Sequence, residues 1–116
     1  MKTWRFIKGY DKYMVSSYGD VISLQRKKPI ILKPNVDAMG YIHYRLYNDE
    51  EIKLFKGHRI VAEHFIDNPN DLPTINHIDG DKKNNRAENL EWCTQQENML
   101  HYHRLKREKK EIDNGL

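Results

Sequence analysis

TINHIDGDKKNNRAENLEWCTQQEN, residues 74–98, contains five asparagines around a single His-x-Asp-Gly. Asparagine favours neither helices nor strands, so such a cluster indicates caps, turns or ligands. TINHI predicts a short strand that ends in a tight turn at the Asp-Gly pair, and LEWCT predicts a second short strand. Thr94 and Glu97 have capping-box spacing, which predicts a helix from Gln95. The stretch therefore predicts a strand, a loop, a strand and a helix.

Two residues of this stretch can meet at one small cleft. His77 lies near the end of the first strand, and Asn98 lies one turn inside the helix. A hairpin folded onto the helix would bring together an imidazole and an amide oxygen. Oxygen ligands suit a hard cation such as Mg²⁺, and a neutral histidine can take a proton from an attacking water. These are the components of metal-assisted phosphodiester hydrolysis.

Residues 4–56 mix aromatic and β-branched runs with turn signals, so we expect a small antiparallel sheet. Its most regular run, GYIHYRLYN, alternates: Ile42, Tyr44 and Leu46 fall on one face, and the more polar residues fall on the other. HRIVAEHFI, residues 58–66, has the spacing of a helix, which the following Asn-Pro should stop.

A short helical turn is also expected after Asn85, which has the spacing of a cap with Glu88 three residues on. The helix from Gln95 should continue through the cations of HRLKREKK, because cations are favoured near a helix C-terminus. The last ten residues are mostly charged, which is typical of a solvated tail.

Composition excludes several classes of protein. The 116 residues suit one domain or two small modules that share a core. A single cysteine, Cys93, excludes an intrachain disulfide and a cysteine-based zinc site. No apolar run could span a membrane, and the N-terminus lacks the apolar core of a signal peptide. We therefore expect no membrane partner and a cytoplasmic location.

Charge is distributed unevenly between the two halves. Residues 1–59 contain 12 Lys and Arg against 6 Asp and Glu, whereas residues 60–116 contain 8 against 11. A basic half beside an acidic, asparagine-rich half suits a polyanion held next to a cation site. An unevenly charged solvated surface is the simpler interpretation of the charge pattern alone.

NHIDGDKKNNRAENLEWCTQQEN, residues 76–98, resembles the motif of the HNH endonucleases found in phages and introns. WRFIKGYDKYMVSSYGDV, residues 4–21, resembles the NUMOD4 module that accompanies this motif. LKP, GY and HRIVAEHFI follow in the family's order, so the resemblance covers roughly residues 4–101. It implies a metal-dependent DNA endonuclease and a phage or mobile-element origin, hence a bacterial host cytoplasm.

The resemblance implies a role for each matching residue. His77 matches the general base that activates water. Asn89 matches the middle motif residue, which ties down the loop between the two strands. Asn76 and Asn98 match the two metal-ligand positions. The implied cofactor is a divalent cation, with Mg²⁺ expected and Mn²⁺ expected to substitute for it.

Asn76 departs from the family pattern, because several members have Asp at this position. Two neutral amides would then hold the metal without a carboxylate, so affinity in the absence of DNA should be weak. Phosphate oxygens would complete the site. Asp79 or His101 could stand in as a metal or phosphate contact, on the basis of their proximity in sequence. An EF-hand interpretation fails, because the sixth position of that loop is Asn84 rather than glycine.

The implied partner is double-stranded DNA, contacted mainly by the basic half. Cations there can neutralise phosphates; the candidates are Arg26, Lys27, Lys28, Lys33, Arg45, Lys53, Lys56 and Arg59. His58 and Arg59 are equally compatible with packing or with a solvated surface. One active site cuts one strand, so a single chain should nick, and the sequence leaves monomer and homodimer open.

The predicted fold class is α+β, with a small N-terminal antiparallel sheet, then a helix and a ββα-metal unit. The expected divisions are a NUMOD4-like DNA-binding sheet at 1–57, a connecting helix and linker at 58–72, the HNH unit at 73–105 and a charged tail at 106–116.

Two alternatives belong to other classes. A catalytically weak DNA-binding accessory protein would keep the fold; the amide at position 76 and the chain's ending soon after the helix motivate it. A structural zinc module lacks enough Cys and His at usable spacing.

Overall fold

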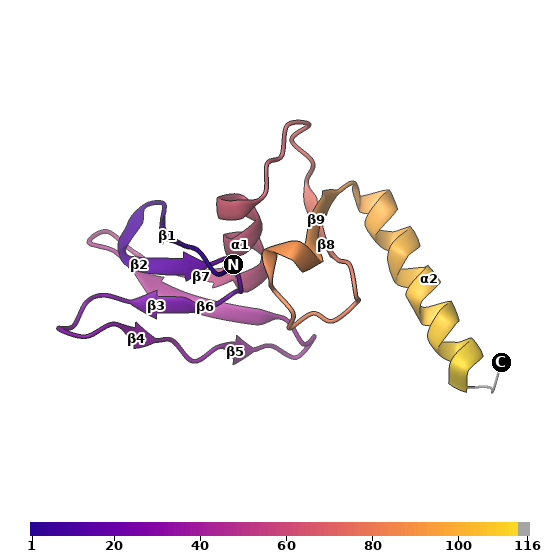
Figure 1. Ribbon diagram of the computed structural model, residues 1–116, viewed down its shortest axis with the longest axis horizontal. Helices are drawn as coiled ribbons and strands as arrows, with labels where there is room; N and C mark the ends of the chain where they lie inside the picture. The colour runs from indigo at the N-terminus through magenta and orange to yellow at the C-terminus, as the bar shows by residue number, and fades with distance from the viewer. Residues whose placement is uncertain (114–116) are drawn as a thin grey trace.

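Three small antiparallel sheets and two α-helices form the structure, a computed structural model that describes residues 1–113 (Figure 1). The molecule is elongated, 55 × 31 × 29 Å, and α2 extends away from the sheets. In chain order the elements are β1 (Trp4–Ile7), β2 (Tyr10–Ser16), β3 (Val21–Ser23), β4 (Ile30–Ile31), β5 (Asn35–Val36), β6 (Ile42–Tyr47), β7 (Ile52–Lys56), α1 (Gly57–Phe65), β8 (Thr74–His77), the 3-10 helix η1 (Ala87–Asn89), β9 (Leu90–Cys93) and α2 (Gln95–Asp113).

The first sheet has the strand order β1-β2-β3-β4. Its central hairpin turns at Gly19, whose φ of +92° lies in the left-handed region that glycine adopts without steric cost. Val15 and Val21 pair across β2 and β3, and both are fully buried. This turn is one of those expected within residues 4–56.

Residues 4–56 form two sheets rather than the single sheet predicted, because β5, β6 and β7 make a second one. The break falls at Lys33-Pro34, where proline lacks the backbone N–H that a continuous ladder requires. Alternation along β6 is as predicted: Tyr44 and Leu46 are buried, and Arg45 is exposed.

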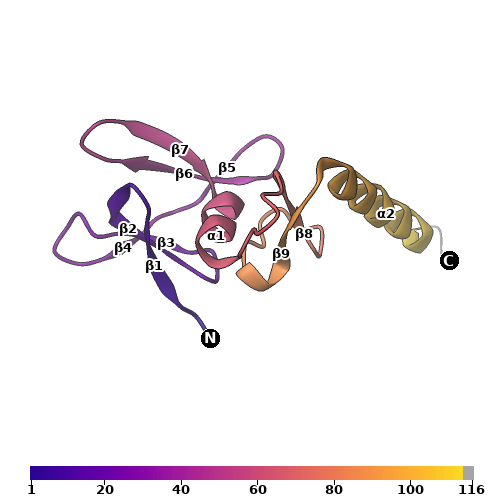
Figure 2. The same ribbon diagram turned by 90° about the horizontal axis from the view of Figure 1, so that it is seen from above.

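Helix α1 connects the N-terminal sheets to the C-terminal hairpin (Figures 1 and 2). It contacts β1, β2, β6 and β7 on one side of the molecule and β8, β9 and η1 on the other. Ile60 and Val61 are buried in this junction, as the helical spacing predicted. Burying side chains of this size contributes roughly 1.5–3 kcal/mol each. Because both lie in the same buried cluster as residues of the sheets and of the hairpin, the two halves share one core.

The hairpin and α2 follow the predicted order. β8 pairs antiparallel with β9, and the register places His77 opposite Leu90. The backbone N–H of Thr94 donates to Glu97 Oε1 at 3.0 Å, and the N–H of Glu97 donates to Thr94 Oγ1 at 3.1 Å. This confirms the capping box and the helix start at Gln95.

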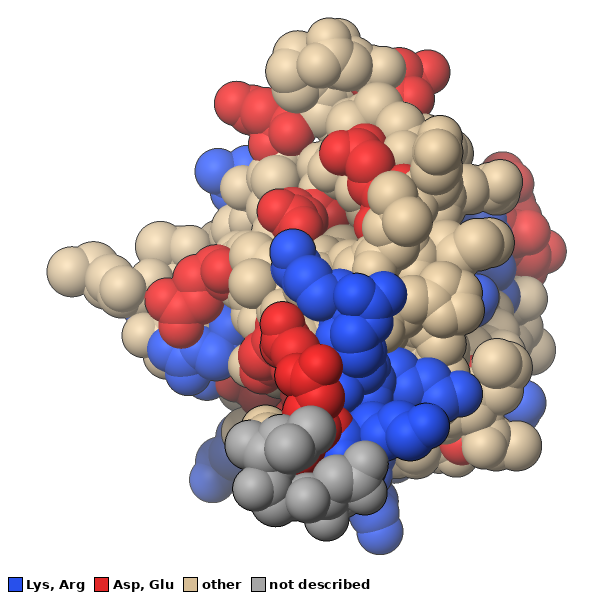
Figure 3. Space-filling model, turned by 90° about the vertical axis from the view of Figure 1, so that its right-hand side faces the viewer, with Lys and Arg blue, Asp and Glu red and all other residues tan. Residues whose placement is uncertain are grey.

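α2 runs to Asp113 without a break, so residues 106–113 of the predicted tail are helical, and residues 114–116 lie outside the described part. Lys and Arg side chains gather at this end of the molecule beside acidic ones (Figure 3). Within residues 1–113, no helix combines the length and the apolar composition that crossing a bilayer requires. The division into a sheet module, a linker and an HNH unit remains a prediction.

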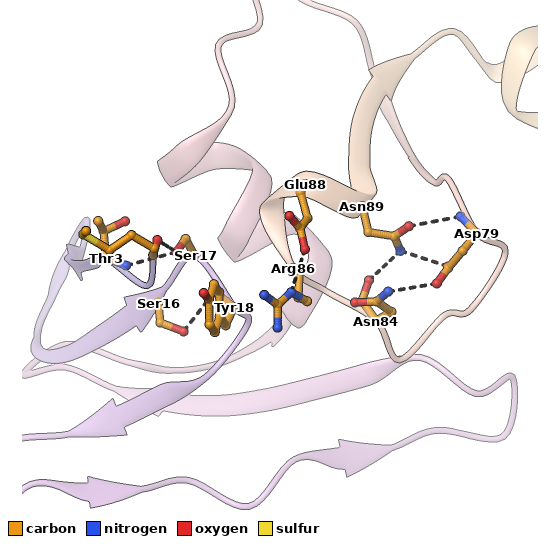
Figure 4. A network of polar contacts seen from close by, with 10 residues as sticks. Thr3, Ser16, Ser17, Tyr18, Asp79, Asn84, Arg86, Glu88 and Asn89 are labelled. Carbon is orange, nitrogen blue, oxygen red and sulfur yellow. Dashed lines mark hydrogen bonds and ion pairs between the residues drawn. The ribbon is translucent and has the colours of Figure 1, made fainter.

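The hairpin turn between β2 and β3 packs on the segment that leads into η1 (Figure 4). The backbone N–H of Ala87 donates to the carbonyl oxygen of Ser17 at 2.8 Å. The Arg86 guanidinium lies 3.7 Å from the centre of the Tyr18 ring, within the range of a cation–π contact. Residues far apart in sequence thus hold the loop between β8 and β9.

His58, the second residue of α1, is buried beside this loop. Its Nδ1 is buried and has no hydrogen-bond partner among residues 1–113. Burial lowers the pKa of His58 from its ordinary value of 6.5 to about 4, and the neighbouring His77 adds to the shift. The ring is therefore neutral at physiological pH.

Burial of a neutral His58 should make stability depend on pH. As pH falls below about 6.5, the unfolded chain binds a proton that the folded ring, with its pKa of about 4, does not bind. Protonation then favours unfolding, and this residue should cost about 2 kcal/mol of unfolding free energy between pH 7.5 and pH 5. Urea unfolding of wild type and His58→Leu at both pH values measures the difference.

The variant should lose less stability than wild type over this range, whatever its stability at pH 7.5. His103→Leu, at an exposed position of α2, serves as the matched control and should follow wild type. Equal pH dependence in wild type and His58→Leu would contradict the assignment.

Candidate active site

A pocket of about 540 Å³ lies between β8 and α2. Its lining includes the predicted base, both predicted amide ligands and both predicted stand-ins: His77, Asn76, Asn98, Asp79 and His101. A larger pocket of about 930 Å³ lies elsewhere, and its lining includes Asp11, Asp49 and Glu50. Three carboxylates beside a single lysine would repel a polyanion, so the smaller pocket is the candidate site.

His77, the last residue of β8, has one ring nitrogen engaged inside the protein. The residue is only 8% exposed, and its Nε2 lies 2.8 Å from Oδ1 of Asn85. An amide oxygen can only accept, so Nε2 carries the proton and donates. The other nitrogen, Nδ1, has no hydrogen-bond partner among residues 1–113 and retains its lone pair.

Asn85 does not cap η1 as the sequence analysis predicted. The N-cap residue is Arg86, and it makes no side-chain cap hydrogen bond. Asn85 is instead 4% exposed and points inward to His77, because the loop turns it into the junction with the N-terminal sheets. The spacing of Asn85 and Glu88 indicates only a helix cap, so the hydrogen bond between Asn85 and His77 was not predicted.

Three rings cluster at the wall of the pocket, which Tyr41 and His77 line. The centroids of His58 and His77 lie 5.2 Å apart in an edge-to-face arrangement, and Tyr41 lies 5.5 Å from His58 and 6.3 Å from His77. The sequence analysis left His58 between phosphate contact, packing and a solvated surface; the structure shows packing. Its place one helical turn before Val61, on the same face, is the sequence signal that favours burial.

Asn76 has a defined amide orientation. Its Nδ2 donates to Oε1 of Glu91 at 2.9 Å, across the β8–β9 pair. A carboxylate only accepts, so the contact fixes which end of the amide is nitrogen. The Oδ1 of Asn76 has no partner among residues 1–113 and is the end available to a cation. Asn98 also lines the pocket, from the first turn of α2.

The amide oxygens of Asn76 and Asn98 are ligands of the type that a hard cation binds, although two ligands do not fill its coordination shell. Amide oxygens are ligands that Mg²⁺ and Ca²⁺ accept. Within residues 1–113 no cluster of three or more His, Cys, Asp or Glu side chains is arranged to hold a metal. Water or phosphate oxygens would therefore have to complete the coordination, as the sequence analysis expected.

Asn89 makes three hydrogen bonds that shape the loop (Figure 4). Its Oδ1 accepts from the backbone N–H of Asp79 at 3.0 Å, and its Nδ2 donates to Asp79 Oδ1 and to the carbonyl of Asn84, both at 2.9 Å. The side chain touches the loop rather than the pocket, which is the bracing arrangement that the family resemblance implied.

The two stand-in ligands have their polar atoms engaged. Asp79 accepts from Asn84 and Asn89, and the hydrogen bond from Asn84 is the main cause of its lowered pKa. His101 donates from Nε2 to the carbonyl of Ile78 at 3.0 Å and accepts from Arg104 at Nδ1. Both side chains therefore hold the loop and helix in place, which argues against their use as metal ligands.

The predicted DNA-binding cations occupy different surroundings. Arg26, Lys27, Lys28 and Lys33 are exposed around β4. Arg45 and Lys53 lie on the second sheet, and Lys56 lies 5.8 Å from the Tyr41 ring centre, near the pocket. Arg59 is engaged with Glu63, the carbonyl of Pro73 and the Trp92 ring.

Three lysines that the sequence analysis did not select line the pocket: Lys82, Lys106 and Lys109. Lys82 lies on the β8–β9 loop, 4.9 Å from the Tyr41 ring centre, and the other two come from α2. They were missed because they lie in the half of the chain with an acidic net charge. Helical spacing of Lys106 and Lys109 with His101 and Asn98 is the signal that could have found them.

Two family models match the chain in this order. Residues 3–47 match the NUMOD4 motif, and residues 56–100 match a family described as HNH endonuclease. An uncharacterized HNH endonuclease of Acanthamoeba polyphaga mimivirus is 40% identical over 92 residues, which cover 79% of this chain and 27% of the relative. DNA endonuclease I-HmuI of Bacillus phage SP01 is 38% identical over 97 residues, covering 83% and 55%.

A solved structure of the HNH homing endonuclease I-HmuI, described as showing DNA binding and cleavage, is similar in fold. It superposes with a TM-score of 0.75 at 34% identity, over 97% of this chain and 59% of that chain. The chain thus spans about a quarter to just over half of the length of these relatives. Its two matched segments, its α+β fold and its pocket place it among the HNH endonucleases that carry an N-terminal NUMOD4 motif.

Proposed function

We propose that this chain is a metal-dependent DNA endonuclease that hydrolyses a phosphodiester bond of double-stranded DNA and nicks one strand per active site. The observation that carries the proposal is the pocket between β8 and α2, which brings together His77, Asn76 and Asn98. The similarity to I-HmuI, whose solved structure is described as showing DNA binding and cleavage, supports the same assignment.

His77 would act as the general base. Its Nε2 is engaged with Asn85, so Nδ1 is the nitrogen that can take a proton from water. The amide oxygens of Asn76 and Asn98 would hold a divalent cation, with Mg²⁺ expected, and this ion would stabilise the charge that develops on the phosphate. The proton acceptor and the cation-binding oxygens thus lie in one pocket, as in-line hydrolysis requires.

DNA would enter along the lysines that line the pocket. Lys82, Lys106 and Lys109 are placed to neutralise phosphates beside the scissile bond. The exposed cations of the N-terminal sheets would extend the contact along the duplex. Because a single pocket holds a single candidate base, one chain would cut one strand, and a double-strand break would need two chains or two events.

A second candidate function is a DNA-binding accessory protein with weak or no cleavage. The specific observation that favours it concerns the carboxylates near Asn76: Glu91 accepts the Asn76 amide N–H and does not line the pocket, and Asp79 is engaged within the loop. It predicts DNA retardation without a metal-dependent product.

Supercoiled plasmid separates the two functions. Wild type should give open-circle product with Mg²⁺ or Mn²⁺ and none with EDTA. His77→Ala should lower the nicking rate by about 10²- to 10⁴-fold, the usual contribution of a general base. His103→Ala, on exposed α2, is the matched control and should cut like wild type. Retardation of DNA without any product from wild type would favour the accessory protein, and full activity of His77→Ala would mean that the base is wrong.

Substitution of Asn76 should change metal affinity in a way that Glu91 controls. Asp at position 76 would supply a full negative charge, yet it would face the Glu91 carboxylate that now accepts the amide N–H. The double variant Asn76→Asp/Glu91→Gln should therefore bind Mn²⁺ about tenfold tighter than wild type, and Asn76→Asp alone should gain less.

Isothermal titration calorimetry with Mn²⁺ in the absence of DNA measures this affinity directly. Glu91→Gln alone is the control, and it should bind no tighter than wild type. Unchanged affinity in the double variant would remove Asn76 from the cation site.

A further inference from the structure

Asn85 lies in a slot whose walls come from two distant glycines. A Cβ built on Gly57 would lie 2.8 Å from Nδ2 of Asn85, and one built on Gly19 would lie 3.1 Å from its Cβ. Real Cβ atoms almost never approach as closely as 2.8 Å, so a side chain at position 57 would displace the Asn85 amide. At position 19 the contact would be tight, and the φ of +92° would strain any side chain. One wall belongs to α1 and the other to the β2–β3 turn.

The closeness of these walls restricts the Asn85 amide. Its Oδ1 lies 2.8 Å from His77 Nε2, while its Nδ2 is buried and has no partner among residues 1–113. Leaving a buried N–H unpaired is unfavourable, so close packing by Gly19 and Gly57 and the hydrogen bond from His77 must hold the amide in this orientation. Rotation by half a turn would place N–H against Nε2 and move the ring proton to Nδ1.

The N-terminal module supports this arrangement from outside. The Ser17 carbonyl accepts from the N–H of Ala87, and the Tyr18 ring packs on Arg86, the residue after Asn85. Gly19, the next residue of the same turn, forms the wall of the slot. Three consecutive residues of the turn between β2 and β3 therefore contact three consecutive residues of the loop.

We propose that Asn85 is the positioning residue for His77: its amide oxygen holds the ring in the Nε2–H tautomer, and the β2–β3 turn of the N-terminal module keeps that amide in place. The inference rests on the proposed role of His77 as base, because that tautomer leaves Nδ1 free to accept the proton of water. The NUMOD4-like module thereby has a second role besides DNA contact, as part of the support of the active site.

Long-range ¹H–¹⁵N NMR of the imidazole rings reads the tautomer without any cleavage. The full chain is labelled at histidine nitrogens, kept free of metal, and measured at a pH well above the usual histidine range. Wild type should show a protonated Nε2 and an unprotonated Nδ1 for His77. Asn85→Leu, similar in shape but without an amide, should show a mixture of the two tautomers. His103, exposed on α2, is the internal control and should not change.

A second variant tests the slot without removing the amide. Gly57→Ala suits the helix better by propensity, yet its Cβ would displace Nδ2 of Asn85. Gly57→Ala should also shift His77 toward a mixture of tautomers. It provides the same test if Asn85→Leu does not fold. In nicking assays both variants should lower kcat by about tenfold or more with little change in KM, because Asn85 is buried and does not line the pocket.

The outcomes distinguish this inference from the proposed function. An Nδ1–H tautomer in wild type, or an unchanged Nε2–H tautomer in both variants, would overturn the positioning role even if the wild type nicks DNA. A tautomer change in the variants would support the positioning role even if wild type proves unable to cut DNA.

Discussion

The loop between β8 and β9 depends on one amide. Between Ile78 and Asn89 the chain is almost entirely polar, so no apolar core can fix its path. The Asn89 side chain replaces that core with three hydrogen bonds to Asp79 and Asn84. Each satisfies a backbone or carboxylate group that would otherwise need water, and together they set where His77 and Asn85 meet.

Packing against the N-terminal sheets also holds the loop between β8 and β9 in place. Helix α1 buries its apolar face between the sheets and the hairpin, and the β2–β3 turn lies against the loop itself. The two matched segments therefore share one core, and both contribute to the packing around His77 and Asn85. A change in the N-terminal module can therefore alter the surroundings of His77, the proposed base, through packed atoms.

Neutral groups and cations dominate the pocket. His58 stays neutral because it is buried, and Asn76 and Asn98 are amides; the charged side chains that line the pocket are three lysines and the Asp79 carboxylate. If this chain cuts DNA as proposed, phosphate oxygens of the bound DNA would supply part of the cation coordination that the two amides leave open.

Local sequence patterns predicted the elements whose bounds depend on neighbouring residues in the chain, such as capped helices and short strands. The capping box located the start of α2, and β-strand signals on either side of the loop placed His77 and Asn98 in one pocket. The inward turn of Asn85 was not predictable, because its slot is formed by Gly19 and Gly57 from distant segments. The division of residues 4–56 into two sheets was missed because tertiary packing decides whether a proline ends a sheet or merely bends it.

The central claim, that His77 accepts the proton of the attacking water, is tested most directly by chemical rescue. His77→Gly would leave a cavity at the end of β8 that free imidazole can enter from the pocket. Added imidazole should raise the single-turnover nicking rate of His77→Gly in a saturable way and leave wild type unchanged. Imidazole that has no effect on the variant, or that accelerates wild type equally, would contradict it.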